Sequence, residues 1–186
     1  MNYYDCEIRM SGNLSSAEYE ALRATIRERG TRRITLLVVA LVAWAVLFAV
    51  TIQGGGPLAA FGGLMVLVAG FEAVYSLHVG VERIGRYLQV FYEEAGHLPA
   101  WERTAMAYGR TPTGDGIDPL FSTVFAAGLL LNLVPVGLTG QPVFILAAVL
   151  GHAGFALRIV RARLYAAAQR AKDLERFRRL SQESGG

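Results

Sequence analysis

The chain has 186 residues, of which 53% are hydrophobic and 18% charged, and its formal net charge is +3. Its mean hydropathy is +0.37, and its charged fraction lies below the ~25% typical of soluble domains. A length of this order corresponds to one domain, and the apolar excess argues against an ordinary water-soluble protein. The single cysteine, Cys6, excludes an intrachain disulfide.

The residues before the first apolar block form a predicted cytoplasmic segment. Residues 1–14 are polar, and we expect them to be irregular, with Cys6–Met10 as a candidate short strand. Ser15 and Glu18 have the spacing of a helix capping box. The pattern that follows predicts an amphipathic helix ending at Gly30, which packs either on the membrane surface or on the protein's own cytoplasmic helices.

Two long stretches of the chain contain no charged residue. The first runs from Ile34 to Phe71 and the second from Pro119 to Leu157. Each is long enough for two spans of ~20 residues, and each contains a glycine- and proline-rich break that predicts a turn. We therefore expect an all-α polytopic membrane protein in which four transmembrane helices form two hairpins. The predicted spans are residues 34–52, 58–80, 119–135 and 142–160, with turns at Gln53–Pro57 and Pro135–Pro142.

Arginine and lysine are concentrated outside these spans. They cluster before the first span, between the second and third, and at and beyond the end of the fourth, whereas the two turns carry no charge. Positive residues stay on the cytoplasmic side during insertion. We therefore expect both termini and the middle loop to lie in the cytoplasm, with the spans in the inner cell membrane. Because this orientation accounts for the basic charge, we expect no nucleic-acid partner.

The second and fourth spans are expected to continue as helices into the cytoplasm. The second continues to about Ala95, before Gly96, and the fourth to Leu180. A short helix is expected at 100–108 and a loop at 111–118. The resulting segments are a cytoplasmic N-terminal segment (1–33), the first hairpin (34–80), a cytoplasmic extension and loop (81–118), the second hairpin (119–160) and a cytoplasmic C-terminal helix and tail (161–186).

The C-terminal helix carries apolar and small residues at the spacing of a heptad seam. Its members are Leu157, Val160, Leu164, Ala167, Ala171 and Leu174. The expected partner of this seam is the extension of the second span, and the other candidate is a neighbouring subunit.

Glu72 interrupts the second predicted span, and His152 lies in the fourth. A carboxylate deep in a bilayer is costly, so such residues usually face protein or water and often mark a pathway. Both residues lie eight positions from the inner ends of their spans, Gly80 and Val160, and we expect an intramembrane contact between them. The alternatives are a protonated Glu72 hydrogen-bonded inside the protein, a water-lined pathway or ligand site, and exposure to lipid.

Four further polar residues lie at the cytoplasmic end of the second span: His78, Glu82, Arg83 and Arg86. The first two are one helical turn apart, which is typical of an ordinary interfacial pair. The functional alternative is that this group lines a cytoplasmic mouth.

Several other polar residues were considered as sites. Ser122, Thr123 and Asn132 are expected to form hydrogen bonds between helices. Glu94 and His97 match only half of a carboxylate di-iron motif, so we expect no metal site. No nucleotide-binding or catalytic motif is present, so no cofactor is expected and an enzyme is the third choice.

Two functional classes follow from these features. The first is a small integral membrane interaction or scaffold protein that oligomerises or serves as a subunit of a larger membrane complex. The seam, the basic cytoplasmic helices and the lack of a catalytic motif favour it. The alternative is an oligomeric ion channel or proton-linked carrier that uses the Glu72–His152 pair.

Overall fold

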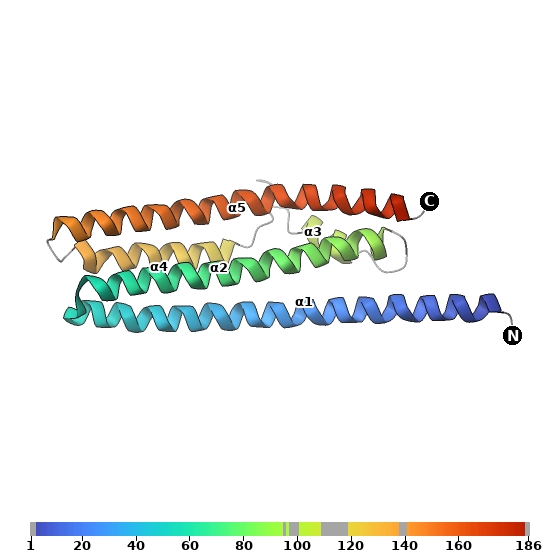
Figure 1. The fold of residues 1–186 in the computed structure, drawn as a ribbon, viewed down its shortest axis with the longest axis horizontal. Helices are drawn as coiled ribbons and strands as arrows, with labels where there is room; N and C mark the ends of the chain where they lie inside the picture. Colours follow the sequence, from blue (N-terminus) through green and yellow to red (C-terminus); the bar gives the residue numbers. More distant parts are fainter. Residues whose placement is uncertain (1–2, 95, 97–100, 109–118, 138–140, 185–186) are drawn as a thin grey trace.

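The residues that this computed structural model describes, 3–94, 96, 101–108, 119–137 and 141–184, are nearly all helical and include no strand. The prediction of an all-α fold is therefore confirmed for these residues. The elements are α1 (Tyr3–Val50), the π-helical turn η1 (Thr51–Gly55), α2 (Gly56–Leu88), a second π-helical segment η2 (Gln89–Glu93), α3 (Trp101–Tyr108), α4 (Pro119–Gly137) and α5 (Pro142–Ser184) (Figure 1). The expected loop at 111–118 lies outside the described residues.

The first helix corrects two expectations. Cys6–Met10 is helical rather than a strand, and α1 continues through Gly30 without a break, so no separate amphipathic helix precedes the apolar block. A single glycine in a helix interior costs only about 1 kcal/mol, and no proline occurs in this segment to end the helix. The long apolar continuation beyond Arg33 therefore carries the helix through this position.

The chain reverses direction after α1, as the glycine-rich break predicted. Gly54 and Gly56 have φ angles of 97° and 73°, values that residues with a side chain rarely adopt. The last turn of η1 leads directly into Pro57 near the start of α2, where proline fits because its missing N–H has no helical partner. As a result, α1 and α2 lie antiparallel (Figure 1).

The other helix ends follow local signals, with one exception. Gly96, with φ 79°, follows η2 as expected. The expected helix at 100–108 is α3, whose first backbone N–H groups, those of Glu102 and Arg103, donate to the Glu93 carboxylate. The exception is Pro135, which was predicted to end its helix but lies inside α4, two residues before the end at Gly137.

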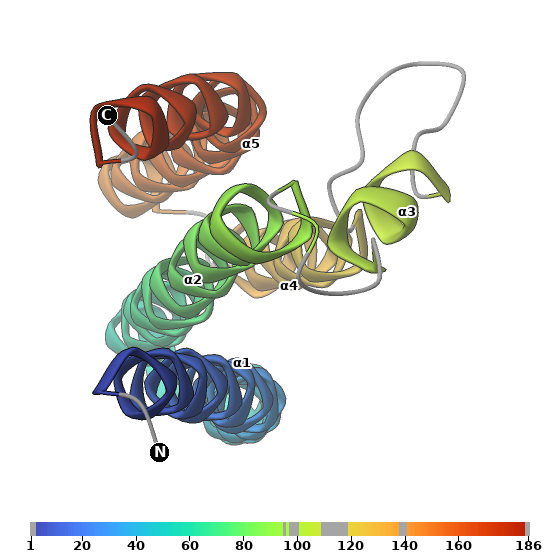
Figure 2. The ribbon, with the colours of Figure 1, turned by 90° about the vertical axis from the view of Figure 1, so that its right-hand side faces the viewer.

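The second helix is the centre of the structure. It contacts α1, α4 and α5, and α4 also contacts α5; Figure 2 shows α2 between α1 and α5. The main core joins α2, α4 and α5 through edge-on contacts of the Phe71 ring with the rings of Phe125 and Phe155, and Leu67 is fully buried in the same cluster. The core therefore runs along one side of α2.

The helices are apolar on the outside as well as in the core. Two continuous helical stretches, Ser16–Glu93 and Pro142–Glu183, are long and apolar enough to cross a membrane, and the apolar stretch Ser122–Gly137 is shorter. The first of these stretches contains the reversal at Gly54–Gly56 and so consists of two antiparallel arms. Exposed large apolar side chains gather on one half of the structure, from α1 (Ile34, Leu36, Val38, Val39, Val42, Val46, Val50), η1 and α2 (Ile52, Leu58, Met65), α4 (Leu130, Leu131, Val134) and α5 (Val143, Phe144, Leu146, Val149, Leu150, Leu157, Val160, Leu164). We call this set the apolar band.

The close contact between α1 and α2 gives a stability prediction. A Cβ atom placed on Gly70 would lie 2.5 Å from Cβ of Ala40, whereas one placed on Gly30 would have no atom within 4 Å. We expect Gly70→Ala to lower the free energy of unfolding by about 1–3 kcal/mol, because the two helices must separate. The same change at Gly30 should raise it by up to about 1 kcal/mol, because alanine favours the helix. Thermal unfolding in detergent, followed by circular dichroism, measures both changes, and equal effects at the two positions would contradict this packing.

Candidate functional site

A buried polar cluster inside the apolar half of the structure joins all four long helices. Its centre is Asn132 on α4, whose side-chain oxygen accepts a hydrogen bond from the indole N–H of Trp44 on α1 at 3.1 Å. The Asn132 amide nitrogen donates to the carbonyl of Ala60 on α2 at 3.0 Å and lies 3.2 Å from Nε2 of His152 on α5. Asn132 was predicted to bond between helices, and this is confirmed.

The hydrogen bonds of this cluster define the state of His152. Its Nδ1 lies 2.7 Å from the carbonyl oxygen of Ala148, which can only accept, so Nδ1 carries the proton. Nε2 then accepts from the Asn132 amide, so the imidazole is neutral. Adding a proton at Nε2 would place two donors against each other. The cluster is therefore a closed set of paired groups that holds four helices together, and it offers no free site for a proton.

Glu72 forms an ion pair with Arg158 of α5. The Arg158 guanidinium donates to Glu72 Oε2 at 2.7 Å, and the side chains of Arg158 and Glu72 are 39% and 42% exposed. The guanidinium also lies over the rings of Tyr75, at 5.1 Å, and Phe71, at 6.0 Å. These distances are in the range of a cation–π interaction. Glu72 is thus paired but only half-buried.

The structure does not bring Glu72 and His152 together, since each has other partners. The hydrogen bonds between α2 and α5 at this level, Glu72–Arg158 and Tyr75–Ala162, join residues 86 and 87 positions apart in sequence. The sequence-based expectation aligned Gly80 with Val160, an offset of 80. His152 consequently lies six residues, or ~9 Å along α5, from the level of Glu72.

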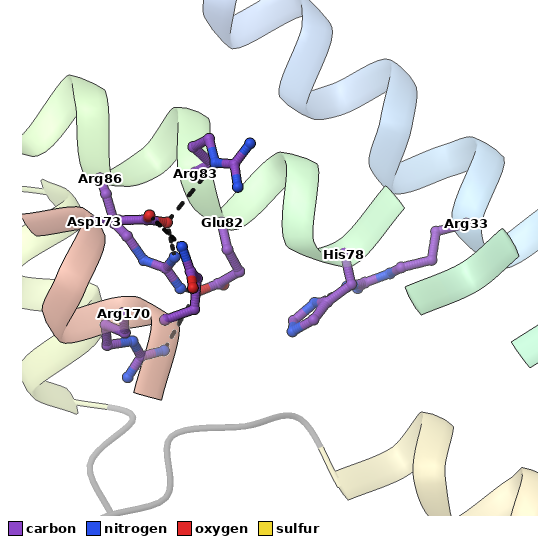
Figure 3. A network of polar contacts seen from close by, with 8 residues as sticks. Arg33, His78, Glu82, Arg83, Arg86, Arg170 and Asp173 are labelled. Carbon is purple, nitrogen blue, oxygen red and sulfur yellow. Dashed lines mark hydrogen bonds and ion pairs between the residues drawn. The ribbon is translucent and has the colours of Figure 1, made fainter. Parts of the chain in front are cut away.

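A second polar cluster lies between the distal halves of α2 and α5, and we call it the charge network (Figure 3). Arg86, whose side chain is 4% exposed, donates to Asp173 at 2.7 Å and to Glu82 at 3.1 Å. Glu82 also accepts from Arg170 at 3.3 Å, and Asp173 from Gln169 at 2.8 Å. The second helix and α5 are therefore held together by the buried Arg86–Asp173 ion pair and the partly buried Glu82–Arg170 ion pair.

The residues expected to line a mouth divide between two places. Glu82 and Arg86 belong to the charge network, and Arg83 lies at its edge, 3.9 Å from Asp173. His78 instead contacts Arg33 of α1 at 3.0 Å, and Figure 3 shows this pair apart from the network. The cavity beside Arg86 has a volume of about 60 Å³ and is lined by Ile26, Val81, Glu82, Gly85, Arg86, Gln89 and Glu102. This volume holds a few water molecules, so the described cavity is no wide opening.

Tyrosines and carboxylates attach the distal part of α1 to α2. The Glu18 carboxylate accepts hydrogen bonds from the hydroxyls of Tyr87 and Tyr92, each at 2.9 Å. Burial, with the Glu18 hydrogen bond second, raises the pKa of Tyr92 to about 12. Arg23 pairs with Glu102 of α3 at 2.6 Å, and burial raises the pKa of that carboxyl despite the cation.

The predicted seam on α5 points away from the other helices. Leu157, Val160 and Leu164 are 51%, 52% and 67% exposed. The face of α5 that packs on the rest of the structure instead carries Phe155, Ile159 and Ala162. Ala171 is exposed and Leu174 half-buried, and the side chain of Ala167 lies outside the described part of the chain. The first part of this seam, Leu157 to Leu164, is therefore not covered by another described helix of the chain.

The far end of α5 gives a prediction for pH. Arg178 donates to both carboxylate oxygens of Glu94, at 3.1 and 2.8 Å, and this hydrogen bonding lowers the pKa of Glu94 below its ordinary 4.5. Because the folded pKa lies below the unfolded one, the contribution of Glu94 to stability is complete above the ordinary value. It is lost as the pH falls through the folded value. The protection factors of the amides at 174–183, which are corrected for the intrinsic pH dependence of hydrogen exchange, should therefore fall on acidification.

The matched variant for this pH effect is Glu94→Gln, which removes the titrating group. Its protection factors at 174–183 should be low already at neutral pH and should change less on acidification than those of the unmodified protein. An unchanged pH profile in this variant would show that another group controls the end of α5. Glu102 acts in the opposite direction, because its raised pKa favours the folded state at low pH.

No protein-family model, curated protein or solved structure matches this chain. Among the described residues, no group of three or more His, Cys, Asp or Glu is placed to hold a metal ion. The outstanding features are thus the apolar band, the cluster around Asn132, the Glu72–Arg158 pair and the charge network. All four concern how helices hold each other and what surrounds them.

Proposed function

We propose that this protein is a small integral membrane interaction protein. In this proposal the chain crosses the inner membrane four times as two hairpins, α1–α2 and α4–α5, and both termini lie on the cytoplasmic side. The distal halves of α1, α2 and α5 then project into the cytoplasm, and the protein self-associates or serves as a subunit of a larger membrane complex.

The apolar band is the observation that carries this proposal. Soluble monomers rarely expose contiguous apolar patches of more than a few hundred Å², yet valines, leucines and isoleucines are exposed on α1, α2, α4 and α5 over the same half of the structure. Inside this band the polar residues Asn132 and His152 are buried and bonded to one another. Apolar side chains on the outside and hydrogen-bonded polar groups on the inside are the arrangement that the hydrocarbon core of a bilayer favours.

The interior of the band favours an interaction protein over a pore. Phe71, Phe125 and Phe155 fill the space between α2, α4 and α5. The polar groups of Asn132 and His152 are used by each other and by Trp44 and backbone carbonyls. The proton-linked alternative needed Glu72 and His152 as one pair, and these residues have separate partners. One protomer thus provides little polar lining for a path.

The cytoplasmic arms suit a docking role. Ion pairs that join α2 to α5 recur from Arg86–Asp173 to Glu94–Arg178, so the two arms are held as one rigid unit. The later part of the seam of α5, with Leu164 and Ala171 exposed, lies on the outside of that unit. A partner that contacts this face would meet a preformed surface, and less ordering entropy would be lost on binding.

Cysteine labelling tests the proposed orientation. In a Cys6→Ser background, single cysteines replace Ile52 in the η1 turn and Gln182 near the end of α5, both of which are exposed. A membrane-impermeant maleimide should label the cysteine at position 52 in intact cells and that at 182 only after the inner membrane is opened. The reverse pattern, or equal labelling at both sites, would overturn the topology.

Crosslinking in native membranes tests the interaction function. A photoreactive amino acid at Leu164 should yield a discrete crosslinked product, either to a second copy or to another membrane protein. The same probe at Leu131 of α4, which is also exposed, should yield mainly lipid adducts. If the Leu164 probe gave only lipid adducts and the purified protein were a monomer that copurified with nothing, the interaction function would be refuted.

A further inference from the structure

The Glu72–Arg158 ion pair is half-exposed within the apolar half of the molecule. Leu157 and Val160, on either side of Arg158, are exposed members of the apolar band. Gly70, two residues before Glu72, packs against Ala40, which lies inside the uncharged stretch of α1. In the proposed orientation this pair therefore borders hydrocarbon, where intramembrane charges are costly unless protein or water surrounds them.

Among the described residues, exposed positions precede both members of this pair along their helices. On α2, Leu58 and Met65, which are 83% and 66% exposed, precede Glu72 at seven-residue intervals and so share its face. On α5, Gly154 lies one turn before Arg158, and a Cβ atom placed there would have no atom within 4 Å. An apolar surface thus leads to the ion pair on one helix, and a small residue permits close approach on the other.

The direction of the ion pair restricts what can cover it. Contacts between α2 and α5 advance together along both helices, from Glu72–Arg158 to Arg86–Asp173, so the helices are parallel and paired residues share one depth. The vector from Glu72 to Arg158 therefore lies nearly in the membrane plane. A twofold rotation about the bilayer normal reverses such a vector and leaves its depth unchanged.

We infer that a second copy of this chain covers the surface formed by Leu58, Met65, Glu72, Gly154 and Arg158. The two copies are related by a twofold axis along the bilayer normal, so Glu72 of each copy faces Arg158 of the other. This inference rests on the proposed membrane function and names one partner for it. An isologous contact of this kind closes on itself and gives a dimer.

Charge complementarity is the reason to choose a second copy. The pair has no net charge, so an anionic lipid headgroup would gain attraction from Arg158 and meet repulsion from Glu72. A covering surface must instead present both signs in reverse order at the same depth. The chain itself supplies such a surface, and burial of the four charges together shields each of them from hydrocarbon.

A charge-exchange experiment in liposomes tests this inference. Two differently tagged forms of each variant are coexpressed, reconstituted together and scored for dimers by photobleaching of single fluorophores. Glu72→Arg places two cations on the contact surface of each copy, and Arg158→Glu places two anions there. Like charges then face each other in the dimer, so each variant alone should self-associate at least about tenfold more weakly than the unmodified protein. Mixing the two variants should restore association, because cations then face anions. The double variant, with the pair reversed, should self-associate normally.

A steric pair of variants covers the case in which the charge variants do not fold. Gly154→Leu adds bulk on the proposed contact without touching another residue of its own copy, and it should weaken self-association at least about tenfold. Leu131→Phe, on an exposed position of α4, should leave it unchanged. Equal association in all variants, or a monomeric unmodified protein in liposomes, would overturn the inference.

The other outcomes separate this inference from the proposed function. A protein that is monomeric in liposomes but crosslinks to a different membrane protein through Leu164 would refute only the twofold dimer. Native mass spectrometry that found one retained lipid per chain, lost in Arg158→Glu, would assign the surface to lipid and also refute the dimer. A failure of the cysteine labelling pattern would refute the proposed membrane orientation itself.

Discussion

Replacement of Asn132 by leucine is expected to lower the free energy of unfolding by about 2–4 kcal/mol, because this residue joins four helices. Leucine has nearly the same size but cannot bond. The Trp44 indole N–H, the Ala60 carbonyl and His152 Nε2 would each lose a partner. The measurement is unfolding by sodium dodecyl sulfate in mixed micelles, followed by far-ultraviolet circular dichroism and by the fluorescence of the two tryptophans, Trp44 and Trp101.

The matched control for Asn132→Leu is Leu130→Ala, two residues earlier on α4. Leu130 is exposed in the apolar band, so its truncation should change the free energy of unfolding by less than about 0.5 kcal/mol. If Asn132→Leu were neutral or stabilising, the hydrogen bonds between helices would contribute little. In that case the apolar contacts alone would hold α1 and α4 in place.

The second large effect is expected at Asp173. Its replacement by leucine leaves the buried Arg86 guanidinium with only Glu82 as an ionic partner. Removal of one partner of a buried ion pair typically costs about 3–5 kcal/mol. We expect about 3 kcal/mol here, since one partner remains, together with faster amide hydrogen exchange in the arms of α2 and α5.

The double variant Arg86→Met/Asp173→Leu separates the two possible sources of this loss. Removing both charges should recover at least half of it, because a buried ion pair can often be replaced by apolar side chains at little cost. Glu82 keeps Arg170 as its partner in this variant. Glu175→Gln breaks an exposed ion pair with Arg179 on the same helix and should cost less than about 0.5 kcal/mol. A double variant as unstable as Asp173→Leu would contradict the ionic explanation.

The helices and their ends were largely predictable from the sequence, because local chemistry determines them. Stretches without charge predicted long helices, and Gly54 and Gly56 predicted the reversal, since their positive φ angles exclude most other residues. The end of η2 before Gly96 and the position of α3 follow from similar signals. The predicted helix ends were wrong where a single residue was taken as the only signal. Gly30 and Pro135 both lie inside helices.

The register between helices was not predictable from the same signals. The prediction took the depths of Glu72 and His152 from assumed span ends. The resulting offset between α2 and α5 was wrong by six or seven residues, so Glu72 and His152 have other partners than the predicted ones. Packing of Gly151 on Leu64 and of Phe155 on Phe71 fixes that register, and these contacts depend on side-chain shape across helices.

The charge network was not predicted from the sequence. Asp173 lies within a strongly basic stretch of α5, and it was not predicted to be a site residue. An acidic residue on a helix with many arginines is nevertheless a signal for a buried ion pair. The heptad spacing of Leu157 to Leu174 predicted a contact face. In the structure the first residues of this face, Leu157, Val160 and Leu164, are exposed. Periodicity identified a face but could not identify its partner.

Spin labels on the apolar band test the central claim most directly. Single labels at Val46 on α1, Leu131 on α4 and Leu150 on α5, with one at Gln182 as a reference, are compared by electron paramagnetic resonance in liposomes. Lipid-facing sites are accessible to oxygen and shielded from a water-soluble nickel complex. We predict this result at the first three sites and the opposite at 182. Free access of the nickel complex to all four labels would contradict the placement of this band in a bilayer.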